Sequence, residues 1–286
     1  MTTVAVLANR YPNSQRVKKI FESKLDHYQI KRIDNDIDRP DFVISIGGDG
    51  SLLSAFHKYK QFIDHTHFIG IHTGHLGFYT DWLVDEIDEL VQKLSEGITE
   101  THAYPLLDIE MNYIDQFQIK HICLNEFVIR TSFRTVVCDV FMNGQMFETF
   151  RGDGLCISTP TGSTGLNKSL GGAVVHPSIP AFQLTEIGSI NNVVYQSLQS
   201  SMIIPKTDTI HLKLREPNER VVVTMDNILL DKTGLHSIKL GLSDQTIKFA
   251  GFKHRPFWSR VNQTFIGKPH HEDWEYIQNR AFEHGI

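Results

Sequence analysis

The chain has 286 residues, and its 28 Lys and Arg against 33 Asp and Glu give a net charge of −5 at pH 7. This mild acidity argues against a dedicated nucleic-acid binder, which usually carries a basic excess on one face. No apolar run approaches the roughly 20 residues that a membrane-spanning helix needs, and the N-terminus lacks the basic-then-apolar order of a signal peptide. We therefore expect a cytoplasmic protein with no membrane partner, divided at about 150 residues per domain into two domains.

Residues 1–101 predict an α/β nucleotide-binding domain. Short apolar runs predict strands, and apolar side chains at helical spacing predict the helices between them, with Gly97 at a helix C-cap. The expected strands are 4–8, 41–46 and 67–71, and the expected helices are 13–25, 52–59 and 84–94. Repeated units of this kind predict a parallel sheet covered by helices, similar to a Rossmann fold.

Residues 102–267 predict a β-rich second domain, whose last segment we expect to return to the first. Turn-forming pairs separate several of its strands: Asn143–Gly144, Asp226–Asn227 and Ser243–Asp244. The expected strands are 126–131, 136–141, 155–158, 202–204, 210–214, 221–225, 237–242 and 246–252, and one helix is expected at 177–192. Residues 268–286 form a polar tail with three aromatic residues, for which a docking helix and disorder both stay open.

Three cysteines lie in apolar, strand-like runs, and we expect all of them to be buried: Cys123, Cys138 and Cys156. The chain has fifteen histidines but no H-E-x-x-H motif, so no structural zinc is expected.

The first chemically informative segment is the run Gly47-Gly48-Asp49-Gly50, between a predicted buried strand and a helix. Ligands of open α/β sheets bind at the carboxyl ends of the strands, and the free amides of a following helix bind phosphate. The alternative is an ordinary turn with Asp49 as a helix cap. Neither the P-loop motif nor a complete G-x-G-x-x-G is present.

Two more segments carry polar groups suited to a nucleotide. Asn125 and Glu126 enter the β-rich domain, where an amide can pair with a base and a carboxylate with ribose hydroxyls; a solvated strand start is the alternative. Residues 151–172 then combine glycines, hydroxyls and one lysine, a composition that suits a loop around phosphate and sugar but also an ordinary surface loop.

Taken together and in this order, these segments resemble the NAD kinase family, and most closely its bacterial, Firmicutes-type members. The quoted matches are the GGDG loop, IHTGHLGFYTDW, LNE, RGDGLCISTPTGSTGLNKSLGGAVVHPS, LTEIGSIN and RPFWSRV, over about residues 42–265. The resemblance implies transfer of the ATP γ-phosphoryl group to the 2′-hydroxyl of the adenosine ribose of NAD, giving NADP. It also implies Mg²⁺, an N-terminal α/β domain, a C-terminal β-sandwich and a homo-oligomer, either a dimer or a tetramer.

The resemblance also assigns roles to residues. Asp49 corresponds to the catalytic aspartate, Gly47, Gly48 and Gly50 to the phosphate-binding glycines, and Gly50 also to a neighbour of NAD. The remaining NAD-binding positions are Asn125, Glu126, Arg151, Asp153, Thr161, Thr164, Gly165, Leu166, Asn167, Lys168, Ser169, Gly188, Asp226 and Asn227. Sites near Asp153 are completed by a neighbouring chain in this family.

This sequence departs from the family at two places. Many relatives have Ala-Tyr where this chain has Gly165-Leu166, so a stacking partner for the ligand is lost, and Asn227 stands where relatives often have histidine or glycine. Two other functions stay open. One is a kinase of the same fold acting on another hydroxyl, as lipid kinases resembling diacylglycerol kinase do, and the other is a noncatalytic NADP-binding sensor.

Overall fold

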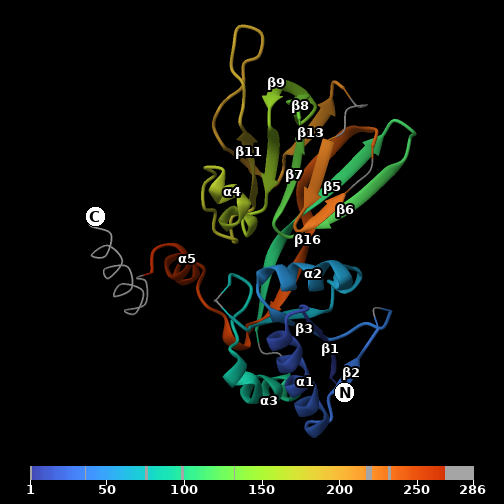
Figure 1. Ribbon diagram of the computed structural model, residues 1–286, viewed down its shortest axis with the longest axis vertical. Coiled ribbons are helices and arrows are strands. Elements are labelled where there is room, and N and C mark those ends of the chain that lie inside the picture. Colours follow the sequence, from blue (N-terminus) through green and yellow to red (C-terminus); the bar gives the residue numbers. More distant parts are fainter. Residues whose placement is uncertain are drawn as a thin grey trace.

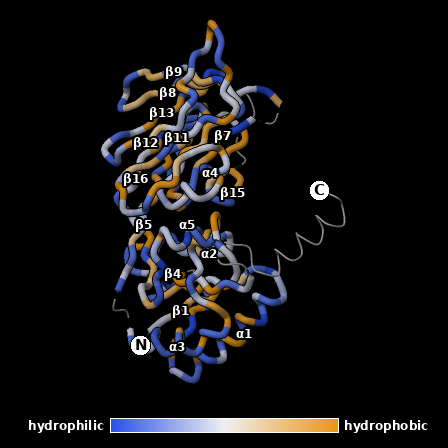
Figure 2. The backbone as a smooth tube through the Cα atoms, turned by 90° about the vertical axis from the view of Figure 1, so that its left-hand side faces the viewer, coloured by the Kyte–Doolittle hydropathy of each residue, from blue (hydrophilic) through white to orange (hydrophobic). Residues whose placement is uncertain are grey.

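The computed structural model describes residues 2–35, 37–74, 77–97, 100–131, 133–216, 221–230 and 233–267. The predicted tail at 268–286 lies outside the described residues. The described chain forms two halves, one above the other in Figure 1, with helices α2 and α5 at the level where the halves meet in both views (Figures 1 and 2). No helix in the described ranges is long and apolar enough to cross a membrane.

The N-terminal half is a parallel sheet with helices on both faces, as predicted. Its strands lie in the order β2-β1-β3-β4, and its elements are β1 (Thr3–Ala8), α1 (Pro12–His27), β2 (Lys31–Ile33), β3 (Phe42–Gly47), α2 (Asp49–Tyr59), a 3₁₀ helix (Lys60–Phe62), β4 (His67–His72), a second 3₁₀ helix (Val84–Glu86) and α3 (Ile87–Glu96). Alternate strand residues face different helices: Val4 and Val6 share a core with α1 and α3, whereas Ala5 packs with α2. Gly97 follows α3 with φ +92°, which confirms the predicted C-cap glycine.

The C-terminal half is a sandwich of two mainly antiparallel sheets around one apolar core. Its strands are β5 (Thr101–Tyr113), β6 (Gln118–Cys123), β7 (Glu126–Thr131), β8 (Val136–Met142), β9 (Gln145–Gly152), β10 (Gly154–Ser158), β11 (Ala181–Ile187), β12 (Met202–Pro205), β13 (Thr209–Leu214), β14 (Val221–Met225), β15 (Ile228–Leu230) and β16 (Leu235–Ala250). Short helices are Gly162–Thr164, α4 (Leu166–Ser169), Gly251–Lys253 and α5 (Phe257–Phe265). The three cysteines are buried, as predicted.

Strands β5 and β16 connect the two halves (Figure 1). They pair with each other along almost their full length, and the last residues of β16 also pair in parallel with β4. The larger sheet therefore continues from the N-terminal half into the sandwich, in the order β2-β1-β3-β4-β16-β13-β8-β9, with β5 on β16 and β6 on β5. The smaller sheet has the order β12-β11-β10-β7-β14-β15.

Two sequence predictions are wrong. Residues 177–192 do not form a helix, because Ala181–Ile187 is strand β11, paired on both edges with β10 and β12. Ser243–Asp244 does not separate two strands either, since β16 runs through it with a bulge between Leu242 and Thr246. The other two turn pairs are confirmed: Asn143–Gly144 joins β8 to β9 and Asp226–Asn227 joins β14 to β15.

Candidate active site

The glycine loop lies where the strand order of the parallel sheet reverses. Strand β1 has β2 on one side and β3 on the other, so a crevice forms at the carboxyl ends of β1 and β3. Gly47 ends β3 with φ +149°, and a Cβ atom on it would lie 2.1 Å from Ser51 Oγ. Helix α2 begins at Asp49, so its first amides are free to bind an anion.

The carboxylate of Asp49 is held by a turn from another loop. The amides of Phe78 and Tyr79 donate to Asp49 Oδ2 and Oδ1, each at 2.9 Å. Gly77 makes this approach possible, because a Cβ atom there would lie 2.2 Å from Asp49 Oδ1. The sequence marked this loop only through the family resemblance, and no local pattern indicated that its amides hold Asp49.

Tyr79 joins Asp49 to the predicted nucleoside residues. Its hydroxyl donates a hydrogen bond to Asn125 Oδ1, while its amide holds Asp49. Burial raises the pKa of Tyr79 well above its usual value, and the nearby carboxylates of Asp49 and Asp226 add to the effect. The phenol therefore stays protonated and acts as the donor.

Asp226 uses both carboxylate oxygens inside the protein. Oδ1 accepts the amide of Asn125 at 2.7 Å, and Oδ2 accepts the amide of Leu124 at 3.1 Å and lies 2.6 Å from His57 Nε2. Because the carboxylate accepts both of these amides, it orients the backbone of Leu124 and Asn125. Its neighbour Asn227 approaches the glycine loop: Nδ2 would lie 3.1 Å from a Cβ atom on Gly50.

Glu126 is a buried carboxyl group facing the hydroxyl-rich loop. Its side chain begins β7, the residue is 9% exposed, and Oε2 has no hydrogen-bond partner within the described parts of the chain. Burial raises its pKa to about 8, with a further contribution from the charge of Asp226. A Cβ atom on Gly165 would lie 3.4 Å from Oε2, so this glycine leaves room beside the carboxyl group.

The hydroxyl-rich loop divides into buried and outward-facing residues. Thr161, Thr164 and Asn167 are buried, with Thr164 Oγ1 donating to the carbonyl of Thr161 at 3.0 Å and Asn167 Oδ1 accepting from Thr185 at 2.7 Å. The more exposed residues of this segment are Gly165, Leu166, Lys168 and Ser169. The buried set therefore builds the loop, and the second set is available to a ligand.

Arg151, Asp153 and Gly188 form a separate cluster. The amide of Asp153 donates to Ile187 at 2.8 Å, and a Cβ atom on Gly188 would lie 2.5 Å from Asp153 Oδ2. Strand β10 leads from this cluster to Ser158, which pairs with Glu126. At about 3.4 Å per residue the two ends of the strand lie about 15 Å apart, so within one chain this cluster is separated from Glu126 by the length of β10.

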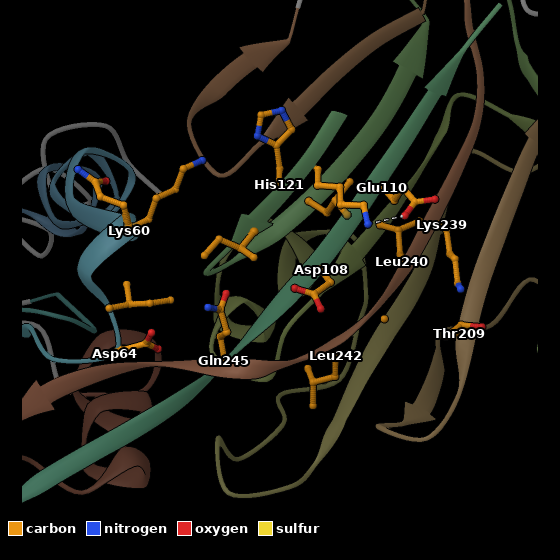
Figure 3. A pocket seen from close by; sticks show the side chains of 16 residues that line it. Lys60, Asp64, Asp108, Glu110, His121, Thr209, Lys239, Leu240, Leu242 and Gln245 are labelled. Carbon is orange, nitrogen blue, oxygen red and sulfur yellow. Dashed lines mark ion pairs between the residues drawn. The ribbon is translucent and has the colours of Figure 1, made fainter. Parts of the chain in front are cut away.

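A sizeable cavity of the described chain lies elsewhere. It has a volume of about 700 Å³ between the 3₁₀ helix after α2 and the outer face of β5, β6 and β16 (Figure 3). Charges of both signs line it, including an ion pair of 3.4 Å between Lys120 and Glu110. None of the predicted site residues lines it, so cavity size does not identify the site here.

Comparisons with known proteins identify the family of this chain. Two family models match, the ATP-NAD kinase N-terminal domain over residues 6–99 and the ATP-NAD kinase C-terminal domain over residues 124–251. The NAD kinase of Enterococcus faecalis is 46% identical over 266 residues, which cover 93% of this chain and 99% of that protein. The NAD kinase of Streptococcus pneumoniae (strain 70585) is 47% identical over 267 residues, covering 93% and 96%.

Two solved structures share the fold. Yeast NADH kinase complexed with NADH aligns with a TM-score of 0.80 at 19% identity, over 94% of this chain and 89% of that one. An NAD kinase from Archaeoglobus fulgidus in complex with ATP aligns with a TM-score of 0.68 at 21% identity, over 92% and 97%. The predicted fold class and the Firmicutes-type resemblance are thereby confirmed. The matching family models, the sequence identity to NAD kinases and the shared fold all indicate one family: this chain belongs to the NAD kinase family.

Proposed function

We propose that this protein transfers the γ-phosphoryl group of ATP to the 2′-hydroxyl of the adenosine ribose of NAD. The bond between the γ-phosphorus and the β–γ bridging oxygen breaks, a bond from the 2′-oxygen to that phosphorus forms, and the products are NADP, ADP and a proton. The observation that carries the proposal is the chain of contacts from Asp49 through Tyr79 to Asn125, which joins the phosphate-binding loop to the nucleoside-binding residues.

Asp49 is the group proposed to contact the acceptor hydroxyl. Each of its oxygens accepts one amide hydrogen, which leaves further lone pairs for the 2′-hydroxyl. Phosphoryl transfer passes through a loose transition state, so positioning and charge stabilisation supply most of the catalysis. Asp49 therefore orients the hydroxyl and accepts its proton late, while the amides of Gly48 and Gly50 at the start of α2 stabilise phosphate charge.

Mg²⁺ fits this site as a companion of ATP. Magnesium is usually bound through one or two carboxylates plus substrate phosphates, and Asp49 is the carboxylate of the glycine loop. The described residues contain no cluster of three or more His, Cys, Asp or Glu side chains that would hold an ion alone. When bound, the ion would neutralise the charge of the triphosphate, and Asp49 is the residue that would hold it.

The adenosine of NAD would lie between Asn125, Glu126 and the exposed part of the hydroxyl-rich loop. Its ribose hydroxyls can donate to Glu126 Oε2, which lacks a partner within the described chain. Leu166 is partly exposed beside Gly165 and offers an apolar surface in place of the aromatic ring of many relatives. Thr161, Thr164 and Asn167 support this loop from beneath, and Lys168 and Ser169 extend it.

We further propose that the nicotinamide half binds in a site shared between subunits of a dimer or tetramer. Arg151, Asp153 and Gly188 lie at the opposite end of β10 from Glu126, so they serve the site of a neighbouring chain. Mixing inactive Asp49→Asn chains with inactive Asp153→Ala chains should restore activity after subunit exchange. A fully active monomer near 33 kDa in light scattering would refute the shared site. The cytoplasmic location stays a prediction.

Incubation with ATP, Mg²⁺ and NAD, followed by detection of NADP with an NADP-specific dehydrogenase, tests the proposed reaction. NADP formation that depends on ATP, on NAD and on Mg²⁺ is the expected result. Phosphorylation of diacylglycerol in place of NAD would favour the lipid-kinase alternative. Tight NADP binding without any turnover would favour the noncatalytic sensor.

A further inference from the structure

Arg260 of helix α5 is a buried cation with acceptors in two segments, the loop that contains Phe78 and Asp81 and the residues just before α5. It is 3% exposed. Its guanidinium donates to the carbonyl of Phe78, to Asp81 Oδ2 at 2.7 Å and to the carbonyl of Arg255 at 3.0 Å, and Nη2 also lies 3.0 Å from His254 Nδ1. Burying an arginine costs free energy unless its N–H donors are satisfied. Here Nε, Nη1 and Nη2 of the planar guanidinium each donate to an acceptor of the protein.

The Phe78 carbonyl belongs to the turn that holds Asp49. The amide of the same residue donates to Asp49 Oδ2, the next amide donates to Oδ1, and the Tyr79 hydroxyl reaches Asn125. A shift of residues 77–79 would therefore move the carboxylate of Asp49 and the amide of Asn125 together. Arg260 contacts neither of these groups itself, so any effect it has on them acts through the turn.

Packing by α5 supports the same turn. The Phe78 ring lies between Phe257 and Phe265, with ring centres 6.4 and 5.8 Å away. Lys168 Nζ lies over the Phe265 ring, 4.2 Å from its centre, in a cation–π contact. Helix α5 therefore touches the hydroxyl-rich loop as well. Figures 1 and 2 place α5 beside the junction of the two halves, where these loops meet.

We propose that Arg260 is a positioning residue for phosphoryl transfer, which fixes the 77–79 turn so that its amides aim both oxygens of Asp49 at the acceptor hydroxyl. This inference rests on the proposed function, because the acceptor hydroxyl is that of the nucleotide. Reaction geometry is sensitive to such support, since a displacement of about 1 Å can cost about 100-fold in rate. Substrate binding depends on other side chains and should change much less.

Arg260→Lys tests the proposal, because it keeps the positive charge but loses the planar fork. We expect kcat to fall at least tenfold while the KM values for NAD and ATP stay within about twofold. Arg255→Lys is the matched control: it makes the same change five residues away, at a side chain whose Nη1 donates to Gln263 Oε1 at 3.4 Å. It should keep wild-type kcat.

Amide hydrogen exchange gives a second readout that does not depend on turnover. In folded Arg260→Lys protein, the amides of Phe78 and Tyr79 should exchange at least tenfold faster than in the wild type, and in Arg255→Lys they should not. If the wild type formed no NADP, the proposed function would fail, but this exchange comparison would still test the link between Arg260 and the turn.

Three outcomes would overturn the inference: a kcat within twofold of wild type in folded Arg260→Lys, an equal loss in Arg255→Lys, or lost kcat with unchanged exchange at Phe78 and Tyr79.

If Arg260→Lys does not fold, Asp81→Asn carries the test, since it weakens the partner that orients the guanidinium. It should lower kcat several-fold with unchanged KM values and faster exchange at the same two amides. Wild-type kcat and exchange in Asp81→Asn would then refute the proposal.

Discussion

Replacing Glu126 by glutamine should stabilise the free protein at neutral and alkaline pH. Burial raises the pKa of this carboxyl from 4.5 to about 8, so the folded protein keeps a proton that the unfolded chain releases between these two values. The contribution of the protonated carboxyl group to the free energy of unfolding is therefore fully present below pH 4.5, and it is lost as the pH rises towards 8. At 1.36 kcal/mol per pKa unit, ionisation favours the unfolded chain by about 1 kcal/mol at pH 5 and about 4 kcal/mol at pH 8.

Urea unfolding of the wild type and of Glu126→Gln at pH 5 and pH 8 measures this difference. Glutamine cannot ionise, so the free energy of unfolding of the variant minus that of the wild type should be about 3 kcal/mol larger at pH 8 than at pH 5. Any fixed packing effect of the amide is the same at both pH values and cancels. The exposed Glu96→Gln serves as the control. A difference that does not change with pH, or that shrinks at pH 8, would refute the reasoning.

The same substitution should weaken the use of NAD. Above pH 8, where Glu126 is ionised, a ribose hydroxyl that donates to the carboxylate gains a charge-assisted hydrogen bond of about 1.5–3 kcal/mol, which glutamine does not provide, so the comparison is made at pH 9. We expect kcat/KM for NAD to fall by a factor of about 10 to 150 while the KM for ATP stays nearly unchanged. Equal losses towards both substrates would contradict the assignment of Glu126 to the nucleoside.

Three further changes test the site and its support. Asp49→Asn should retain NAD binding by calorimetry but lose nearly all turnover, and a kcat above about a tenth of wild type, a barrier change of under about 1.4 kcal/mol, would remove Asp49 from catalysis. Gly77→Ala should lower kcat by about 100-fold, because its Cβ would displace the Asp49 carboxylate; Gly74→Ala, whose Cβ would meet nothing within 4 Å, should not. His254 has its pKa lowered to about 4, chiefly by burial and then by Arg260, so its neutral form stabilises the fold above pH 6.5 and this contribution is lost as the pH falls towards 4. Because the ring is partly solvated, His254→Gln should reduce the stability lost between pH 7 and pH 5 by only about 1 kcal/mol in urea unfolding, and an unchanged pH dependence would contradict this cause.

The parallel half of the fold was predictable because its strands are short apolar runs ended by glycine or polar residues. Strand β11 was missed, although Phe182–Thr185 alternates apolar and polar residues as a strand does, and its polar side chains are buried with those of its apolar residues. Gln183 exchanges hydrogen bonds with the backbone of Ala173, and Thr185 bonds Asn167. These hydrogen bonds satisfy the polar side chains on the buried face of β11, and nothing in the local sequence indicates these partners. Similarly, nothing local shows that β16 continues through Ser243–Asp244, because the pairing of Thr246–Ala250 with β5 decides it.

The candidate site shows the same division. Asp49, Asn125 and Glu126 stood out because each is a polar residue next to a predicted strand. The supporting residues did not, since their roles depend on contacts between distant positions. Arg260 and Phe78 are 182 residues apart, and His57 and Asp226 are 169 apart. For Asp226, the resemblance predicted contact with the dinucleotide, whereas its carboxylate is already occupied by protein donors.

The ladder shared by β5 and β16 has a mechanical consequence for the whole molecule. Because β16 pairs with β5 on both sides of its bulge and then with β4, bending one half against the other would break backbone hydrogen bonds in the middle of a sheet. The two halves are therefore joined by a continuous sheet. Enzymes that close two domains about a hinge have a flexible linker at this place instead. Adjustment to a bound dinucleotide would then fall to the loops around Asp49 and Gly165, while the relative position of the two halves stays set by the sheet.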